Sequence, residues 1–136
     1  MDKYCGDVWN VDICKDHRCG IECMKRGEGK SVFHVGDQIF TTFASYIKDL
    51  NGDNIGHIEV VSNITEETRK SAYNKEEVKK LSTNISKLAE GELRVDFTVD
   101  LPDKYTQEEY DNFNIIASNL EQVRNAIRKM KSGSKK

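Results

Sequence analysis

Four cysteines are the residues of this chain whose type and spacing could do chemistry. Cys5, Cys14, Cys19 and Cys23 all fall near the start, and none occurs in the rest of the 136 residues. Cys19 and Cys23 are four residues apart, which would place them on one face of a helix. Thiolates bind Zn²⁺ tetrahedrally, and His17 is a possible substitute for one of the four. We therefore expect a structural or sensing zinc site at the cysteines.

Other interpretations of the cysteines stay open. An iron–sulfur centre would use the same thiolates, although their spacing matches neither ferredoxin pattern. Thiol redox chemistry and simply packed, inert thiols are the remaining alternatives. The chain starts Met-Asp-Lys-Tyr-Cys, without the apolar stretch of a secretion signal. We therefore expect a cytoplasmic, reducing compartment, in which a disulfide framework is disfavoured.

Composition and motifs argue against several classes of function. The chain has 21 Lys and Arg against 23 Asp and Glu, so no basic field draws it to nucleic acid. Its apolar runs are far shorter than the roughly 20 residues that span a bilayer. No serine elbow, phosphate-binding glycine loop or recognisable acid–base pair is present. We expect no enzymatic activity, no nucleic-acid partner and no membrane span.

A three-stranded antiparallel sheet should follow the cysteine-rich segment. Residues 31–35 and 38–48 are rich in β-branched and aromatic residues and flank the tight turn Gly36-Asp37. Asn51-Gly52 is a strong hairpin signal because both residues tolerate positive φ, and it precedes a third strand over 55–62. With helices after residue 64, the expected fold class is α+β.

Two amphipathic helices should form the second half of the chain. Apolar residues recur there at intervals of three and four, so each helix carries one narrow apolar seam. A second copy of the chain would cover these seams, and we expect a homodimer with four parallel helices. The predicted dimer interface consists of Val78, Leu81, Ile85 and Leu88 in the first helix and Phe113, Ile116, Leu120, Val123 and Ile127 in the second.

The segment between the helices, residues 92–106, allows two structures. Its apolar residues alternate with polar ones, which predicts a strand. The alternative is an extended connector that returns along the helices and anchors itself through Leu93 and Val95. About 15 residues at roughly 3.3 Å each span about 50 Å. A helix of about 18 residues is only about 27 Å long, so the two helices can lie parallel.

Residues 65–130 resemble a HAMP domain, a dimeric relay of two parallel helices joined by an ordered connector. The resemblance rests on Leu88-Ala89-Glu90-Gly91-Glu92-Leu93, on Glu108 or Glu109 opening the second helix, and on Phe113-Asn114-Ile115-Ile116. It implies that Leu93 and Val95 anchor the connector. The connector is slightly longer than the family's, because residues 101–106 are inserted near its end.

Residues 1–64 resemble the C-terminal half of a PAS sensor domain, as found in methyl-accepting chemotaxis proteins and sensor histidine kinases. The matching segments are residues 39–49, the turn Asn51-Gly52-Asp53, residues 55–61 and the exit Asn63-Ile64-Thr65-Glu66. The exit occupies the position of the family's Asp-Ile-Thr-Glu junction, with Asn63 replacing the Asp. The family's first two strands and most of its pocket helices have no counterpart here.

These resemblances imply a truncated PAS-like module over 1–64, with a cysteine-rich segment at 5–23. A HAMP-like relay over 65–131 and a flexible tail over 132–136 would follow. The expected function is cytoplasmic signal transduction, in which a PAS-like input changes a dimeric helical output. A downstream signalling domain or kinase, not present in this chain, would receive the signal. The alternatives are a cysteine-based metal or redox sensor, and a structural adaptor that completes a partner's PAS sheet.

Overall fold

The computed structural model describes residues 11–134 and has the predicted α+β fold. The chain divides into two compact units, Met1–Thr65 and Glu66–Lys136. The first contains a sheet with a short helix, and the second contains two long helices. Among the described residues, no helix is both long enough and apolar enough to cross a membrane.

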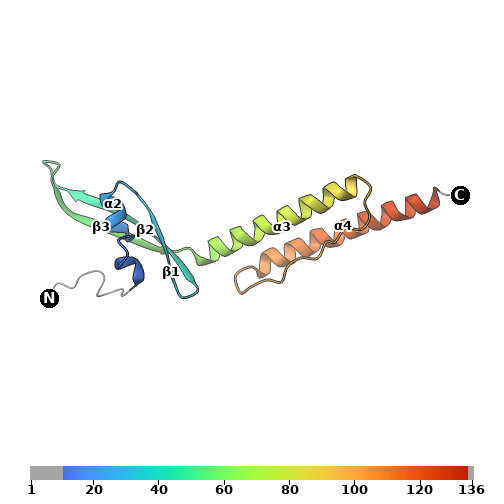
Figure 1. The fold of residues 1–136 in the computed structure, drawn as a ribbon, viewed down its shortest axis with the longest axis horizontal. Coiled ribbons are helices and arrows are strands. Elements are labelled where there is room, and N and C mark those ends of the chain that lie inside the picture. The colour runs from blue at the N-terminus through green and yellow to red at the C-terminus, as the bar shows by residue number, and fades with distance from the viewer. Residues whose placement is uncertain (1–10, 135–136) are drawn as a thin grey trace. The chain divides into compact units, whose positions relative to one another are not determined.

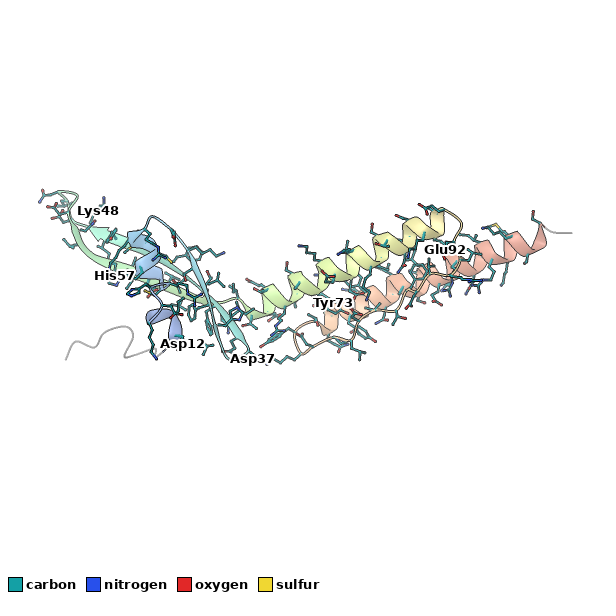
Figure 2. The ribbon with its side chains drawn as sticks, in the orientation of Figure 1. Asp12, Asp37, Lys48, His57, Tyr73 and Glu92 are labelled. Atoms are coloured by element: carbon teal, nitrogen blue, oxygen red, sulfur yellow. The ribbon has the colours of Figure 1, made fainter. Side chains whose placement is uncertain are left out.

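The sheet has three antiparallel strands in the order β1, β2, β3 (Figure 1). They are β1 (Ser31–Val35), β2 (Gln38–Lys48) and β3 (Asn54–Asn63). Gly36 and Gly52, in the two turns, have φ of 59° and 90°, which glycine adopts without steric cost. Figure 2 shows Lys48 beside the turn into β3, at the opposite end of the sheet from Asp37. The predicted sheet is confirmed.

A short helical segment covers one face of this sheet. It consists of the 3-10 turn η1 (Asp12–Cys14) and the helix α2 (Gly20–Lys25), which contacts β2 and β3. The backbone of Gly20 lies so close to the side chains of Thr42 and Glu59 that a Cβ atom at position 20 would collide with both. Glycine therefore permits the helix to approach the sheet at this point.

The second unit is built on α3 (Thr65–Ala89) and α4 (Gln107–Gly133), which lie side by side in Figure 1. Lys70 Nζ lies 3.7 Å from Glu109 Oε1 near the start of both helices. At the other end, Lys131 Nζ donates to the carbonyl of Gly91, 3.0 Å away. The two helices of one chain therefore run in the same direction. Because α4 continues to Gly133, the first two residues of the predicted tail are helical.

The segment between α3 and α4 forms neither helix nor strand and runs back along both helices as an extended connector (Figure 1). Gly91, with φ of 90°, ends the first helix and begins the return. Alternate connector side chains enter the core of the unit, which explains their strand-like spacing. That core contains Leu81, Leu88, Val95, Phe97, Val99, Phe113 and Ala117.

Candidate functional site

The apolar seams of α3 and α4 each divide into a buried row and an exposed row. Leu88 retains 7% of its accessible surface, whereas Val123 retains 48%. The inner row packs within the chain and contains Leu81, Leu88, Phe113, Leu120 and Ile127. The remaining positions, which we call the exposed heptad row, are Val78, Ile85, Ile116, Val123 and Met130.

The exposed heptad row has the spacing of a helix-packing surface. On each helix its members are seven residues apart, so they form a stripe along the helix instead of scattered apolar residues. The two helices run parallel, so both stripes follow one direction. The predicted dimer interface thus divides into residues that pack inside one chain and residues that remain free to pack against a second copy. The dimer itself stays a prediction.

Both predicted connector anchors lie at the core of the helical unit. Val95 is buried, and Leu93 is half-buried and packs against the core. Phe97 and Val99 continue the same alternation and are also buried. The connector is therefore held along most of its length, because every second side chain is removed from water.

Basic side chains of α4 hold one edge of the connector. Arg124 donates to the carbonyl of Val95 at 2.9 Å, and Arg128 donates to that of Leu93 at 3.5 Å. With the bond from Lys131 to Gly91, three alternate connector carbonyls accept from one helix. Hydrogen bonds from charged donors are stronger than those between neutral groups, so these contacts fix the connector's register on α4.

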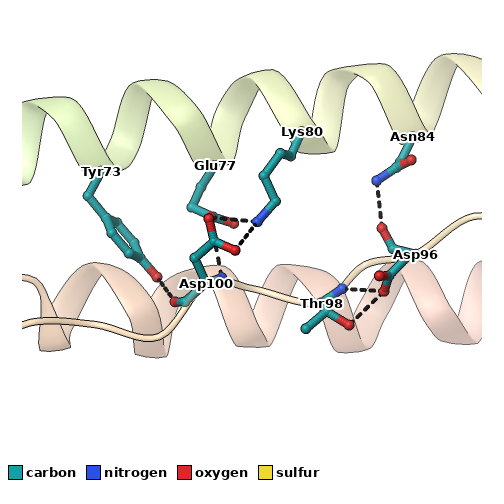
Figure 3. A network of polar contacts seen from close by, with 7 residues as sticks. All are labelled: Tyr73, Glu77, Lys80, Asn84, Asp96, Thr98 and Asp100. Carbon is teal, nitrogen blue, oxygen red and sulfur yellow. Dashed lines mark hydrogen bonds and ion pairs between the residues drawn. The ribbon is translucent and has the colours of Figure 1, made fainter.

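Polar side chains of α3 hold the other edge (Figure 3). The Tyr73 hydroxyl donates to the carbonyl of Asp100 at 2.6 Å, and the Asn84 amide donates to that of Asp96. The N–H of Asp100 donates to Glu77 Oε1 at 3.3 Å. The helices thus share one extended segment, each binding a different set of its backbone groups. We call the contacts from both helices the polar clamp.

Glu77 is the most deeply buried charged group of the polar clamp, with 3% of its side chain exposed. Lys80 Nζ lies 2.8 Å from Glu77 Oε1 and 2.8 Å from Asp100 Oδ1 (Figure 3). The lysine therefore bridges a carboxylate of the helix and one of the connector. If one of these three residues were removed, the others would be left with unsatisfied polar atoms. The cluster should therefore contribute strongly to the stability of the helical unit.

Three ionisable groups in and beside the polar clamp, Lys80, Asp96 and Asp100, have shifted pKa values. The hydrogen bond from Lys80 lowers the pKa of Asp100. Burial acts to lower the pKa of Lys80, but its hydrogen bonds to Asp100 and Glu77 outweigh burial and raise that pKa. The hydroxyl and the N–H of Thr98 both donate to Asp96 and lower its pKa. The clamp is therefore arranged for ionised connector carboxylates.

The exit from the sheet is the second polar site. Thr65, which is buried, accepts a hydrogen bond at its Oγ1 from the N–H of Ile39 at 2.8 Å. Asn63 Oδ1 accepts from the N–H and the hydroxyl of Thr65, at 3.0 and 2.6 Å. Asn63 thus supplies an oxygen acceptor without the charge of an Asp. The first residue of α3 is therefore hydrogen-bonded to the start of β2.

The predicted metal ligands that the structure describes lie in different surroundings. Cys14 and Cys19 line one cavity of about 20 Å³ against the sheet. Cys23 instead donates to the carbonyl of Arg18, and burial raises its pKa. His17 is exposed, and Cys5 lies outside the described residues. Within residues 11–134, no group of three or more His, Cys, Asp or Glu is placed to hold a metal. Zinc and an iron–sulfur centre stay predictions.

No protein-family model, curated protein or solved structure matches this chain. The resemblances to PAS and HAMP domains therefore stay predictions. A three-stranded antiparallel sheet and a pair of helices occur in proteins of many functions, so the fold alone does not identify one.

The polar clamp is the part of the site that sequence reasoning missed. Glu77 and Asn84 each precede a buried leucine of α3 by four residues, so they lie on the side of the helix that faces the connector. Arg124 lies four residues after Leu120 and three before Ile127, again on the inner side. A polar residue three or four positions from a buried apolar residue of the same helix indicates a polar partner at the edge of the core. That spacing could have identified these residues from the sequence.

Proposed function

We propose that this chain is a non-catalytic signal-relay module that acts as a homodimer in the cytoplasm. The sheet unit is the input, and the parallel helices are the output toward a downstream signalling domain or kinase. The exposed heptad row is the observation that carries this proposal. Regularly spaced apolar residues on two parallel helices are suited to pack against the same rows of another copy.

The exposed heptad row is large enough to support a reversible dimer. Full burial of one such side chain contributes about 1.5–3 kcal/mol, so a side chain that is already half-buried gains about 1 kcal/mol. Five residues in each of two copies then contribute about 10 kcal/mol. Association costs about 4–15 kcal/mol in lost freedom. The free energy gained by burial is therefore comparable to the free energy lost on association. This balance suits a dimer whose packing must be able to change.

The polar contacts suggest how a change would pass through the chain. Thr65 connects the sheet to the start of α3, so a shift of β2 would change where α3 begins. The polar clamp connects α3 to α4 through the connector, so a displaced α3 would move α4 with it. Such a relay needs two packings only a few kcal/mol apart, so that a modest input changes their populations.

A cysteine-based metal or redox sensor is the second candidate function. The observation in its favour is the cavity shared by Cys14 and Cys19, which is also lined by Thr42. The Thr42 hydroxyl is buried without a hydrogen-bond partner. In this alternative the cysteines would be the input, and the sheet would carry their change to α3. Metal analysis of protein purified without oxygen or chelator separates it from a relay with another input.

The dimer is tested by a pair of adjacent isoleucines. Ile116 belongs to the exposed heptad row, whereas Ile115 is exposed on a different side of α4. We expect the native chain and Ile115→Asp to sediment at twice the chain mass of 15.5 kDa, and Ile116→Asp to sediment as a monomer. A monomeric native chain, or equal behaviour of the two variants, would contradict the proposal.

The relay is tested by ¹⁹F NMR of protein labelled with 4-fluorophenylalanine. Phe97 adjoins Asp96, which binds Asn84 of α3, about 28 Å along the helix from Thr65. Thr65→Val should shift the Phe97 resonance, because it breaks the contact between sheet and helix. Thr65→Ser keeps the hydroxyl and should leave that resonance in place. An unchanged Phe97 signal in both variants would refute the relay while leaving the dimer intact.

A further inference from the structure

Cys14 and Cys19 border one small cavity between the sheet and the helical segment that covers it. The cavity has a volume of about 20 Å³. Thr42 and Glu59 are the polar residues that the strands contribute to its lining, and the other side chains around it are apolar. About 10–15 Å³ is enough for one water molecule, so the cavity has room for a single oxygen-sized group. Both cysteines are half-buried, so small solutes can reach their thiols.

The backbone between the two cysteines turns back on itself. Cys14 ends η1, and the N–H of Asp16 donates to the carbonyl of Asp12 at 3.1 Å, so the helical turn continues to residue 16. His17 then has φ of 53°, the left-handed conformation that commonly ends a helical turn and reverses the chain. Cys19 directly precedes α2. This reversal brings residues 14 and 19 to the same cavity.

The third described cysteine, Cys23, has other partners. It is a buried residue of α2, and its thiol donates to the carbonyl of Arg18 at 3.4 Å. Arg26 Nη2 donates to the Cys23 sulfur at 3.3 Å, and Arg26 Nη1 donates to the carbonyl of His17 at 2.8 Å. A buried cysteine of this kind is typically inert. Among the cysteines that the structure describes, the two at the cavity are therefore the pair available for reaction.

Thr42 supplies an unmatched polar group to the cavity. The residue is only 3% exposed, and its Oγ1 has no hydrogen-bond partner within the described part of the chain. Buried hydroxyl groups nearly always have a partner, so this one indicates a group that the cavity receives. An oxygen atom bound to a sulfur at the cavity wall would fill that space and accept a hydrogen bond from the Thr42 hydroxyl.

We infer that Cys14 and Cys19 form a reversible disulfide within one chain when they react with a hydroperoxide. With hydrogen peroxide, one thiolate attacks a peroxide oxygen, an S–O bond forms, the O–O bond breaks, and the leaving oxygen departs as water. The second thiol attacks the sulfur of this sulfenic acid, the S–S bond forms, and the S–O bond breaks to release a second water. The two sulfurs lose two electrons to the peroxide, and both thiol protons end in water.

This inference rests on the second candidate function, the cysteine-based sensor, and names its input. A disulfide needs only the two thiols that the cavity brings together, whereas a structural zinc site needs four ligands. The bond would join η1 to the start of α2, which contacts β2 and β3. Oxidation would therefore change how the helical segment covers the strands that precede α3.

Oxidation followed by peptide mapping tests the disulfide. The full chain is reduced, freed of reductant and treated with equimolar hydrogen peroxide, and the remaining thiols are blocked with N-ethylmaleimide. We expect tandem mass spectrometry to show one predominant bond, between Cys14 and Cys19, that dithiothreitol cleaves. Cys23→Ser should form the same bond at the native rate, and circular dichroism checks that this variant stays folded.

The same oxidation in urea shows whether the folded structure selects the pair. The unfolded chain should give mixed pairings of its four cysteines. The inference would be overturned by the same mixture in the folded chain, by a predominant bond to Cys5 or Cys23, or by sulfinic acid without a disulfide.

Thr42→Val tests the role of the cavity. Valine keeps the branched shape and removes the hydroxyl, so oxidation by hydrogen peroxide should slow about fivefold, the factor that one neutral hydrogen bond contributes. Diamide joins thiols without a sulfenic acid, so oxidation by diamide should keep its native rate. An unchanged rate with peroxide, or equal slowing with both oxidants, would overturn the role assigned to Thr42.

The ¹⁹F resonance of Phe97 separates failure of this inference from failure of the sensor function. If the disulfide forms and the Phe97 resonance stays in place, the bond is confirmed and the cysteine-based sensor is refuted. If no disulfide forms but added zinc shifts the resonance in native protein and not in Cys14→Ser, the inference is overturned and the sensor function stands.

Discussion

Replacement of Glu77 by alanine tests whether the polar clamp holds the helical unit together. Glu77 is buried, and its Oε1 accepts from Lys80 Nζ at 2.8 Å and from the N–H of Asp100 at 3.3 Å. Alanine would remove both acceptor contacts at once. Lys80 would keep its ion pair with Asp100, so the connector would stay bound to α3 through fewer contacts.

The expected cost is about 2 kcal/mol in the free energy of unfolding. A buried donor left unsatisfied costs about 1–3 kcal/mol, and the long, part-buried Asp100 N–H contact belongs at the low end. Loss of the Lys80 contact adds about 1 kcal/mol, discounted because the lysine side chain is 37% exposed and keeps a second partner. For a unit of about 70 residues, 2 kcal/mol lowers Tm by about 8–16 °C.

Thermal unfolding followed by helical circular dichroism at 222 nm measures this effect. Protein concentration must be the same for all variants, because dimerisation makes Tm depend on it. Glu76→Ala is the matched control, since it removes the same charge from the adjacent, exposed position. We expect Glu76→Ala to change Tm by less than about 2 °C, as is usual for surface substitutions. Equal shifts in the two variants would refute the structural role assigned to Glu77.

Two further perturbations follow from the polar contacts. Thr65→Val leaves the buried N–H of Ile39 without its acceptor, so it should cost the sheet unit about 1–3 kcal/mol in urea denaturation. Thr65→Ser should cost clearly less, and equal losses would argue against this bond. The pKa values of Asp96 and Asp100 are lowered in the folded chain, so the unfolded chain takes up protons first as pH falls. The stabilisation that these two carboxylates contribute should therefore be fully present above the ordinary aspartate pKa of about 3.9 and should decline as the pH falls below it. Double replacement by Asn should flatten the profile of Tm against pH between 5 and 3, and an unchanged slope would contradict the assignment.

The elements of this fold were accessible from the sequence because their signals are local. Intervals of three and four residues identified both helices, and the Asn51-Gly52 pair located the β2–β3 turn. The segment 92–106 allowed two structures, because a strand and an extended connector have the same alternation of side chains. The difference lies in what binds the backbone of the segment, and the side chains that do so here lie 12 to 40 residues away in sequence.

The site was less accessible, because its key residues depend on the returning connector. Glu77 lies among charged neighbours, a pattern typical of a solvated helix face, yet it is buried and bound to Asp100, 23 residues later. The two rows of each seam are equally apolar in sequence. Which row becomes the inner one depends on where Val95 and Phe97 pack, and no local pattern contains that information.

Odd-numbered and even-numbered residues of the connector bind different helices. Its odd-numbered carbonyls, from Gly91 to Val95, accept from α4, whereas the even-numbered ones at Asp96 and Asp100 accept from α3. After a single inserted residue, each later carbonyl would face the other helix and the buried side chains would turn toward water. Two inserted residues would restore both arrangements. Length changes in this segment should therefore be tolerated in steps of two, so that descendants of this chain would differ there by even numbers.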